Sequence, residues 1–348
     1  MSSIDRAQQS AAANERRRPG ILHDHRLTVA VMLLVALAAL GLASLLCGSV
    51  WLRPAQFFGT DALGSMARLV LFDVRLPRLV LALLIGGTLG LSGAVLQGLT
   101  RNPLAEPGTL GVSSGAALGG VMAIYFGLAH HFVVAIPLLG LAGAAVAMSM
   151  TFALGRGGGT VALILAGAAV TALMVALISL ALNLAENPYA GFEMSTWLLG
   201  SIADKSWSQV WLAGPFIVIG CALLLLTGRS LDALSLGEAQ AESLGINLER
   251  LHGLALLGTA LSVGAATGVA GAIGFVGLVA PHLVRPLLGY QPSRLLLPSA
   301  LAGAALLLAA DLVTRVFSGR DLKLGVFTAL VGTPFFFWLV VRLRRRAP

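Results

Sequence analysis

Apolar runs dominate this 348-residue chain and are separated by short polar segments. A helix needs about 20 mostly apolar residues to cross a bilayer, and most of the runs are near that length. The run at 109–128 is rich in Gly and Ser, and the run at 274–288 contains Pro281 and Pro286, so these two have the weakest pattern. The pattern predicts ten spanning helices, at 27–49, 76–100, 109–128, 132–154, 161–184, 208–227, 253–270, 274–288, 296–317 and 325–342.

Composition supports a membrane protein. Hydrophobic residues make up 57% of the chain and charged residues 11%, whereas a soluble domain has about 25% charged residues. A membrane β-barrel would show alternating segments of about ten residues, and these runs are longer and unbroken. We therefore expect an all-α integral membrane protein, with a disordered polar tail at 1–26 and a single transmembrane domain at 27–348.

Ten spanning helices divide the polar segments between the two sides of the membrane, and the basic residues are unequally distributed between these sides. With the N-terminus inside, 15 of them fall in inside segments and 8 in outside segments. Cytoplasmic loops carry the excess of Lys and Arg, so we expect both termini in the cytoplasm. The net charge of +8 has the same origin, and we expect membrane lipid rather than nucleic acid as its partner. The outside residues are Arg53, Arg68, Arg75, Arg78, Lys205, Arg315, Arg320 and Lys323.

Glycines at four-residue spacing inside the spans favour close packing of helix backbones. Gly-Leu-Ser-Gly-Ala-Val at 90–95 resembles Gly-Val-Ala-Gly-Ala-Ile at 268–273, and each hexamer begins thirteen residues before a proline, Pro103 or Pro281. This spacing suggests two related halves, an arrangement found in many transporters.

The longest polar interruption is at 228–252. Its centre, 236–246, mixes apolar residues with Glu238 and Glu242, which suits short helices at the cytoplasmic surface. An acidic segment on an otherwise basic inner face indicates a docking element, the alternative being a plain solvated connector.

Two serine motifs have unsuitable settings for catalysis. Residues 111–115 match the nucleophile elbow G-x-S-x-G, but that motif needs a strand before it. Residues 90–93 match a serine motif of intramembrane proteases, which need a base within reach of Ser92. The one histidine within an apolar span, His282, lies at a predicted helix end, and we predict no catalytic residue.

Metal and nucleotide sites are not expected either. His130 and His131 are adjacent, so on a helix they would face different ways, and Cys47 and Cys221 lie inside apolar runs. The sequence has no G-x-x-x-x-G-K-[ST] motif. We therefore expect no cofactor on this chain, and if ATP drives this protein, ATP with Mg²⁺ is bound by another chain.

Arginines on the outer side form the strongest candidate site. Arg75 and Arg78 share a helical face, and Asp311 and Arg315 are four residues apart, so the last two can pair. Arg75, Arg78 and Arg315 together would suit a partner that carries carboxylates, the alternative being contact with lipid headgroups.

A series of segments in order resembles the FecCD-type family of ABC importer permeases, which serves iron-siderophore, haem and vitamin B12 transport. The segments are Arg-Leu-Pro-Arg (75–78), Ser-Gly-Ala-Val-Leu-Gln-Gly-Leu-Thr-Arg-Asn-Pro-Leu-Ala-Glu-Pro-Gly (92–108), Leu-Gly-Val-Ser-Ser-Gly-Ala (110–116), Leu-Gly-Glu (236–238), Gly-Ala-Ile-Gly-Phe-Val-Gly-Leu-Val-Ala-Pro-His-Leu-Val-Arg (271–285), Leu-Leu-Leu-Ala-Ala-Asp (306–311) and Leu-Val-Gly-Thr-Pro-Phe-Phe (330–336).

The resemblance implies the type II ABC importer permease fold, as a homodimer or paired permease with two ATP-binding subunits and a periplasmic or lipid-anchored substrate-binding protein. It implies that Arg75, Arg78 and Arg315 dock that binding protein. It places an inner gate region at 155–160, ending in Thr160, although Gly157-Gly158-Gly159 is unusual there. It also implies an ATPase coupling loop at 232–249, with Leu236, Gly237, Glu238, Ala239, Glu242, Leu244 and Gly245.

The cargo implied is a ferric-siderophore-type chelate carried across the cytoplasmic (inner) membrane, with haem or vitamin B12 as alternatives. An ion-coupled secondary transporter would need a buried ion site, and the spans offer only Asp311, near an outer end. Lys323 stands where the family usually has proline, so the resemblance does not predict which contacts that outer loop makes.

Overall fold

The structure is a computed structural model that describes residues 18–48, 62–185, 187–316 and 322–344. Regular structure in these ranges is helical, with no strand, as the all-α prediction requires. In chain order the elements are α2 (Arg18–Leu46), α3 (Ala62–Leu69), the π-helical segment η2 (Val70–Arg75), α4 (Leu76–Leu99), the 3₁₀ turn η3 (Pro107–Leu110), α5 (Val112–Tyr125), α6 (Leu128–His131), α7 (Ala135–Gly155), α8 (Gly159–Asn183), α9 (Pro188–Leu198), α10 (Trp207–Leu226), α11 (Gly228–Leu234), α12 (Glu238–Ser243), α13 (Leu248–Ala270), α14 (Val276–Leu288), α15 (Pro292–Val316) and α16 (Leu324–Arg344).

Every predicted span has a helix in the structure. Eight helices of the described chain are long and apolar enough to cross a bilayer, and α5 and α14 are shorter apolar helices. These two correspond to the runs with the weakest pattern. The chain enters each of these two helices from a turn with a left-handed residue, Gly111 before α5 and Phe275 before α14.

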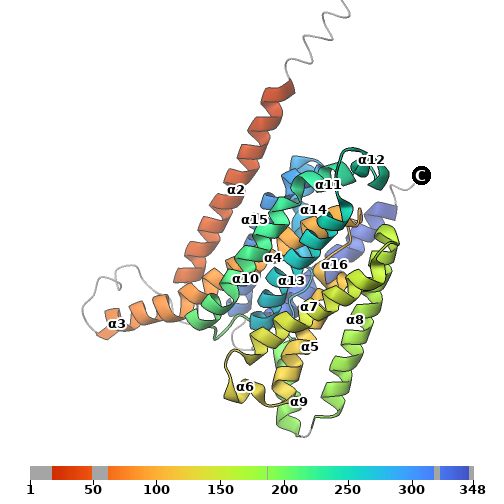
Figure 1. The fold of residues 1–348 in the computed structure, drawn as a ribbon. Coiled ribbons are helices and arrows are strands. Elements are labelled where there is room, and N and C mark those ends of the chain that lie inside the picture. The colour runs from red at the N-terminus through yellow and green to blue at the C-terminus, as the bar shows by residue number, and fades with distance from the viewer. Residues whose placement is uncertain (1–17, 49–61, 186, 317–321, 345–348) are drawn as a thin grey trace, which may run out of the picture.

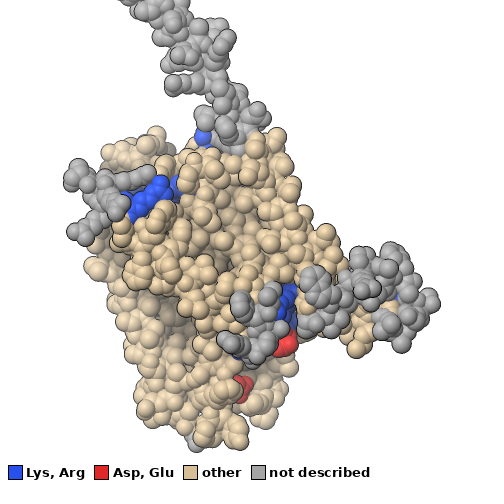
Figure 2. All heavy atoms as spheres, turned by 180° about the vertical axis from the view of Figure 1, so that it is seen from behind, with Lys and Arg blue, Asp and Glu red and all other residues tan. Residues whose placement is uncertain are grey.

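The bundle is built around α4 and α13, as Figure 1 shows. In the most apolar stretch of each of these two spans 78% of the residues are buried, against 11% in α2, which lies along one side of the bundle. The remaining helices surround this pair and leave large apolar side chains exposed, which lipid or partner subunits would cover. On the face shown in Figure 2, charged atoms are few and gather in small patches on an otherwise uncharged surface.

Two similar glycine contacts hold the centre together. Gly90 of α4 lies so close to α15 that a Cβ there would run into the carbonyl oxygen of Ser299. On α13, a Cβ at Gly268 would lie 2.9 Å from the Cα of Pro137 on α7. Gly90 and Gly268 are the first residues of the two similar hexamers. The packing of α4 on α15 and of α13 on α7 therefore supports the interpretation of two related halves.

The two ends of the bundle differ. One end, which we call the Arg78 end, contains α3, α6 and α9, and the opposite end, the α12 end, contains α11 and α12 (Figure 1). The predicted tail needs a correction at its boundary, because α2 begins at Arg18 and residues 18–26 are helical. Backbone hydrogen bonds continue a helix beyond the apolar residues that anchor it. Residues 1–17 lie outside the described chain.

Candidate functional site

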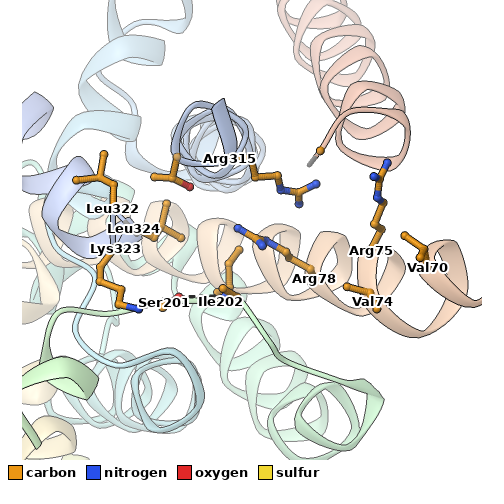
Figure 3. Close-up of a pocket in the computed structure, with 13 residues that line it drawn as sticks. Val70, Val74, Arg75, Arg78, Ser201, Ile202, Arg315, Leu322, Lys323 and Leu324 are labelled. Atoms are coloured by element: carbon orange, nitrogen blue, oxygen red, sulfur yellow. Dashed lines mark hydrogen bonds between the residues drawn. The ribbon is translucent and has the colours of Figure 1, made fainter. Parts of the chain in front are cut away.

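The three predicted docking arginines meet at the Arg78 end. Arg75 is the last residue of η2, Arg78 lies in the first turn of α4, and Arg315 lies in the last turn of α15. Pro77 lies where the π-helical turn of η2 passes directly into α4, within one continuous helical stretch from Gly64 to Leu99. Figure 3 shows Arg78 and Arg315 pointing toward one another, while Arg75 points toward the end of α2.

Asp311 is the shared counter-ion of this cluster. It is fully buried; Arg78 donates from Nε and Nη2 to its Oδ1 at 2.9 and 2.7 Å, and Arg315 donates from Nη2 to Oδ2 at 2.5 Å. The predicted pairing of Asp311 with Arg315 is therefore present. The second partner, Arg78, was not foreseen, because it is 233 residues away in the sequence.

The last residues of α2 accept hydrogen bonds from Arg75 and Arg315. Arg75 Nη1 donates to the carbonyl of Leu45 at 2.7 Å, and Arg315 donates to the carbonyl and the hydroxyl of Ser44 at 2.8 and 3.0 Å. The last carbonyls of a helix lack partners within it and attract cations. Arg75 is consequently only 5% exposed. These arginines thus fasten α2 to the bundle, a role that the sequence did not indicate.

A pocket of about 370 Å³ opens beside the cluster and is lined by all three arginines. Lys323, from the segment before α16, also lines it. The pocket wall therefore carries four cations, with Asp311 as the carboxylate that touches two of them. The positive excess suits an acidic partner, and docking at these residues stays a prediction.

At the α12 end, Glu238, the first residue of α12, contacts residues from two other parts of the chain. Its Oε1 accepts a hydrogen bond from Thr160 Oγ1 at 2.9 Å and lies 3.5 Å from Nη2 of Arg101. Thr160 is the second residue of α8, and Arg101 follows α4. The structure thereby brings the predicted gate region into direct contact with the predicted coupling loop. The side chain of Glu238 is 35% exposed and contacts both of these neighbours.

The other side of α12 remains open. Leu236 and Leu244 are 64% and 63% exposed, whereas Ala241 is buried and anchors the helix. Gly237 and Gly245 flank α12 with φ of 117° and 81°, values that favour glycine. Among the remaining predicted coupling residues, Ala239 and Glu242 are also exposed.

A second ion pair joins the predicted gate region, at Arg156, to Glu249, the last residue of the predicted coupling loop and the second of α13. Arg156 donates to Glu249 at 2.6 Å, and both side chains are more than half exposed, so the pair adds little stability. Arg156, Glu238 and Glu249 line a shared pocket of about 370 Å³. The sequence carried no signal for this pair, whose members are 93 residues apart.

The structure offers no cluster for metal binding among the described residues, where Cys47 and Cys221 are free thiols. Ser92 is buried and donates to the carbonyl of Leu89 on its own helix. Ser114, the neighbour of Ser113 at the nucleophile position of the other motif, donates to the carbonyl of Gly111 at the start of α5. Both hydroxyls thus have local structural partners.

Comparisons with known proteins give one consistent family. The model of the FecCD transport family matches residues 33–342. The hemin transport system permease HmuU of Yersinia pestis is 38% identical over 320 residues, covering 90% of this chain and 95% of its own. The vitamin B12 import system permease BtuC of Klebsiella pneumoniae is 37% identical over 324 residues, covering 91% and 93%.

A solved structure has the same architecture. It is an inward-facing conformation of a metal-chelate type ABC transporter, with a TM-score of 0.80 and 32% identity, covering 91% of this chain and 99% of that one. This chain therefore belongs to the FecCD transport family and is a multi-pass ABC importer permease subunit.

Proposed function

We propose that this permease carries a bulky metal chelate inward through the cytoplasmic membrane, driven by ATP that a separate subunit hydrolyses. One observation carries the proposal: the bundle has an arginine-rich pocket at one end and an exposed apolar and acidic helix at the other. The first suits an acidic binding protein, and the second suits an ATPase.

The orientation follows from the same two ends. The α12 end would face the cytoplasm, because inside segments have more basic residues. The Arg78 end would then face the periplasm or the cell exterior and receive the loaded binding protein. Two copies of the chain, or this chain and a similar permease, would enclose the path.

The cargo is proposed as a metal chelate of the siderophore, haem or cobalamin type. Our expectation from the sequence is a ferric siderophore. Relatives named for hemin and for vitamin B12 give specific reasons to include both tetrapyrrole cargoes.

Uptake measurements decide among these cargoes. Cells with and without the chain are compared for uptake of ferric [⁵⁵Fe]ferrichrome, haemin and radiolabelled cyanocobalamin. We expect chain-dependent uptake of one of the three. The complex is then reconstituted in proteoliposomes with ATP or a non-hydrolysable analogue. Uptake that continues without hydrolysis would indicate a secondary transporter and contradict the proposal.

A further inference from the structure

Helices α4 and α15 pack against each other through their backbones. Gly86 of α4 lies so close to α15 that a Cβ there would meet the carbonyl oxygen of Gly303, and a Cβ at Gly303 would meet the carbonyl oxygen of Gly86. The contact of Gly90 with Ser299 is of the same kind and shows that the two helices run in opposite directions. Close-packed interiors transmit displacement because they compress little. The two helices should therefore move together.

The docking pocket is attached to this helix pair. Arg78 of α4 and Arg315 of α15 both bind Asp311 of α15, so the ion pairs join the two helices at the Arg78 end. Helix α15 has 25 residues, and at 1.5 Å per residue it is about 37 Å long. That length exceeds the roughly 30 Å of hydrocarbon in a bilayer. The pair thus extends from the docking pocket to the opposite end of the bundle.

At the α12 end, α11 packs on both helices of the pair. Leu231 of α11 is fully buried, and it lies with Pro292, the first residue of α15, against Gly98 near the end of α4. Gly228, the first residue of α11, lies against Leu296 of α15. This short helix therefore contacts the α4–α15 pair at the end opposite the arginines.

Asp232 fastens α11 to the start of α15. Its Oδ1 accepts from the backbone amide of Ser293 at 2.8 Å, and its Oδ2 accepts from Ser293 Oγ at 2.6 Å and from Gln291 Nε2 at 2.7 Å. The first amides of a helix lack partners within it and attract negative charge, so this carboxylate caps α15 from a different helix. Asp232 is also the first residue of the predicted coupling loop at 232–249.

We propose that the α4–α15 pair couples the docking pocket to the ATPase-binding segment, and that Asp232 is the positioning residue at the junction. This inference rests on the proposed function, in which a binding protein docks at the Arg78 end and an ATPase binds at the α12 end. When nucleotide binding displaces α12, α11 follows, and Asp232 passes the displacement to α15 and so to Asp311 and its arginines. Nucleotide binding and docking then change each other's affinity by the same factor.

The contact of Glu238 with Thr160 leads instead to the predicted gate region, so the two contacts have separate consequences. Loss of the Glu238 contact would change the cargo moved per ATP. Loss of the Asp232 contacts would change the response of docking to nucleotide.

The affinity of the binding protein for the transporter, reconstituted with its ATPase, tests the route. Surface plasmon resonance measures Kd with and without a non-hydrolysable ATP analogue. Asp232→Ala removes all three hydrogen bonds to the start of α15, and Asp232→Asn keeps an acceptor for the Ser293 amide. Ser235→Ala is the matched control, since this exposed hydroxyl donates only to the carbonyl of Asp232 in its own turn.

In the wild type we expect the two Kd values to differ about fivefold or more, the usual range of coupling between sites. Asp232→Ala should bring the ratio of the two Kd values below about twofold, with Asp232→Asn between these limits and Ser235→Ala like the wild type. ATPase co-purification and the Kd without nucleotide should not change. A merely structural role would lower thermal stability or assembly but leave the ratio as it is. If Asp232→Ala does not assemble, the ratio of Asp232→Asn decides.

Three results would overturn the inference, and they are distinguishable. A wild-type ratio in an assembled Asp232 variant would exclude this route and leave the proposed function intact. Equal Kd values in the wild type with and without nucleotide would show that the two ends are not coupled. A wild-type chain that binds neither an ATPase nor a binding protein would overturn the proposed function and this inference with it.

Discussion

Asp311 is the residue on which the Arg78 end depends. A fully buried carboxylate is stable only because two guanidinium groups satisfy it. Replacing it removes the counter-ion from both arginines and leaves their charges partly buried. The same arginines bind the end of α2, so this defect would spread to that helix.

We expect Asp311→Asn to destabilise the chain by about 3–5 kcal/mol, the cost of breaking a buried ion pair. Thermal unfolding of the purified permease in detergent, followed by circular dichroism, measures the change. Glu242→Gln, which alters an exposed carboxylate, is the control and should unfold like the wild type. An Asp311→Asn chain of unchanged stability would mean that the two arginines have other partners.

Arg78 offers the cleanest test of docking, because it is the more exposed of the two arginines on Asp311, at 20% against 10%. An exposed ion pair contributes up to about 1 kcal/mol, so Arg78→Gln should weaken the binding protein's affinity up to about fivefold. Arg78→Glu should weaken it more, since it repels an acidic partner. Replacing Arg75, Arg78 and Arg315 together should largely abolish docking.

Affinity for the binding protein is measured by surface plasmon resonance on the reconstituted transporter, with increasing salt. Docking should weaken as salt rises. Arg156→Gln, at the opposite end, controls for general loss of charge. If the triple variant keeps its ATPase assembly and its full affinity, the arginines serve only to hold α2.

At the scale of elements, the sequence predicted the helices that have a long apolar run and missed short helices that have none. Apolar runs identified all ten helices of the bundle, because twenty apolar residues have few alternative structures in lipid. The segment α3 with η2 and the helix α9 were not predicted. They are short and mixed in polarity, although Asn187, whose side chain accepts from the amide of Ala190, and Pro188 give α9 a recognisable start.

The sequence predicted which residues belong to the candidate sites, but not the side-chain contacts between residues that are far apart in the chain. Spacing of four residues is enough to pair Asp311 with Arg315. No local pattern could place Arg78 on the same carboxylate or Thr160 on Glu238, since these contacts join residues 233 and 78 positions apart. Such contacts depend on how helices pack.

The element α12 has two sides, and they should respond differently to mutation. Glu238 connects α12 with Thr160, so Glu238→Gln should leave ATPase binding intact but lower the cargo transported per ATP hydrolysed. On the open side, Leu244→Asp should weaken ATPase binding, because it removes an exposed apolar contact.

Both variants are compared by ATPase co-purification, ATP hydrolysis and uptake in proteoliposomes. Ser243→Ala, which removes a hydroxyl bonded only to its own helix, is the control. If Glu238→Gln abolishes ATPase binding and Leu244→Asp does not, the assignment of the two sides is reversed.

The whole molecule contains two similar pairs of packed helices, α4 on α15 and α13 on α7. In each pair, the first helix of one predicted half packs on the third helix of the other half. In lipid, helices lack a hydrophobic drive toward one another, so close backbone contact at small residues is a main source of their association. Gly90 and Gly268 occupy corresponding places in these pairs. The stability of the bundle should therefore depend on both.

We expect Gly90→Ala and Gly268→Ala each to destabilise the chain by about 1–3 kcal/mol, the usual cost of overpacking a tight interior. Backbone atoms meet the new methyl group at both positions, so no side chain can rotate away. Because the two contacts lie in different helix pairs, the double variant should lose close to the sum of the single losses. Gly253→Ala is the matched control, since it places a methyl group in open space within α13. Thermal unfolding in one detergent measures all four chains. If Gly268→Ala unfolds like Gly253→Ala while Gly90→Ala is destabilised, the second helix pair does not reproduce the first, and the resemblance between the two hexamers is fortuitous.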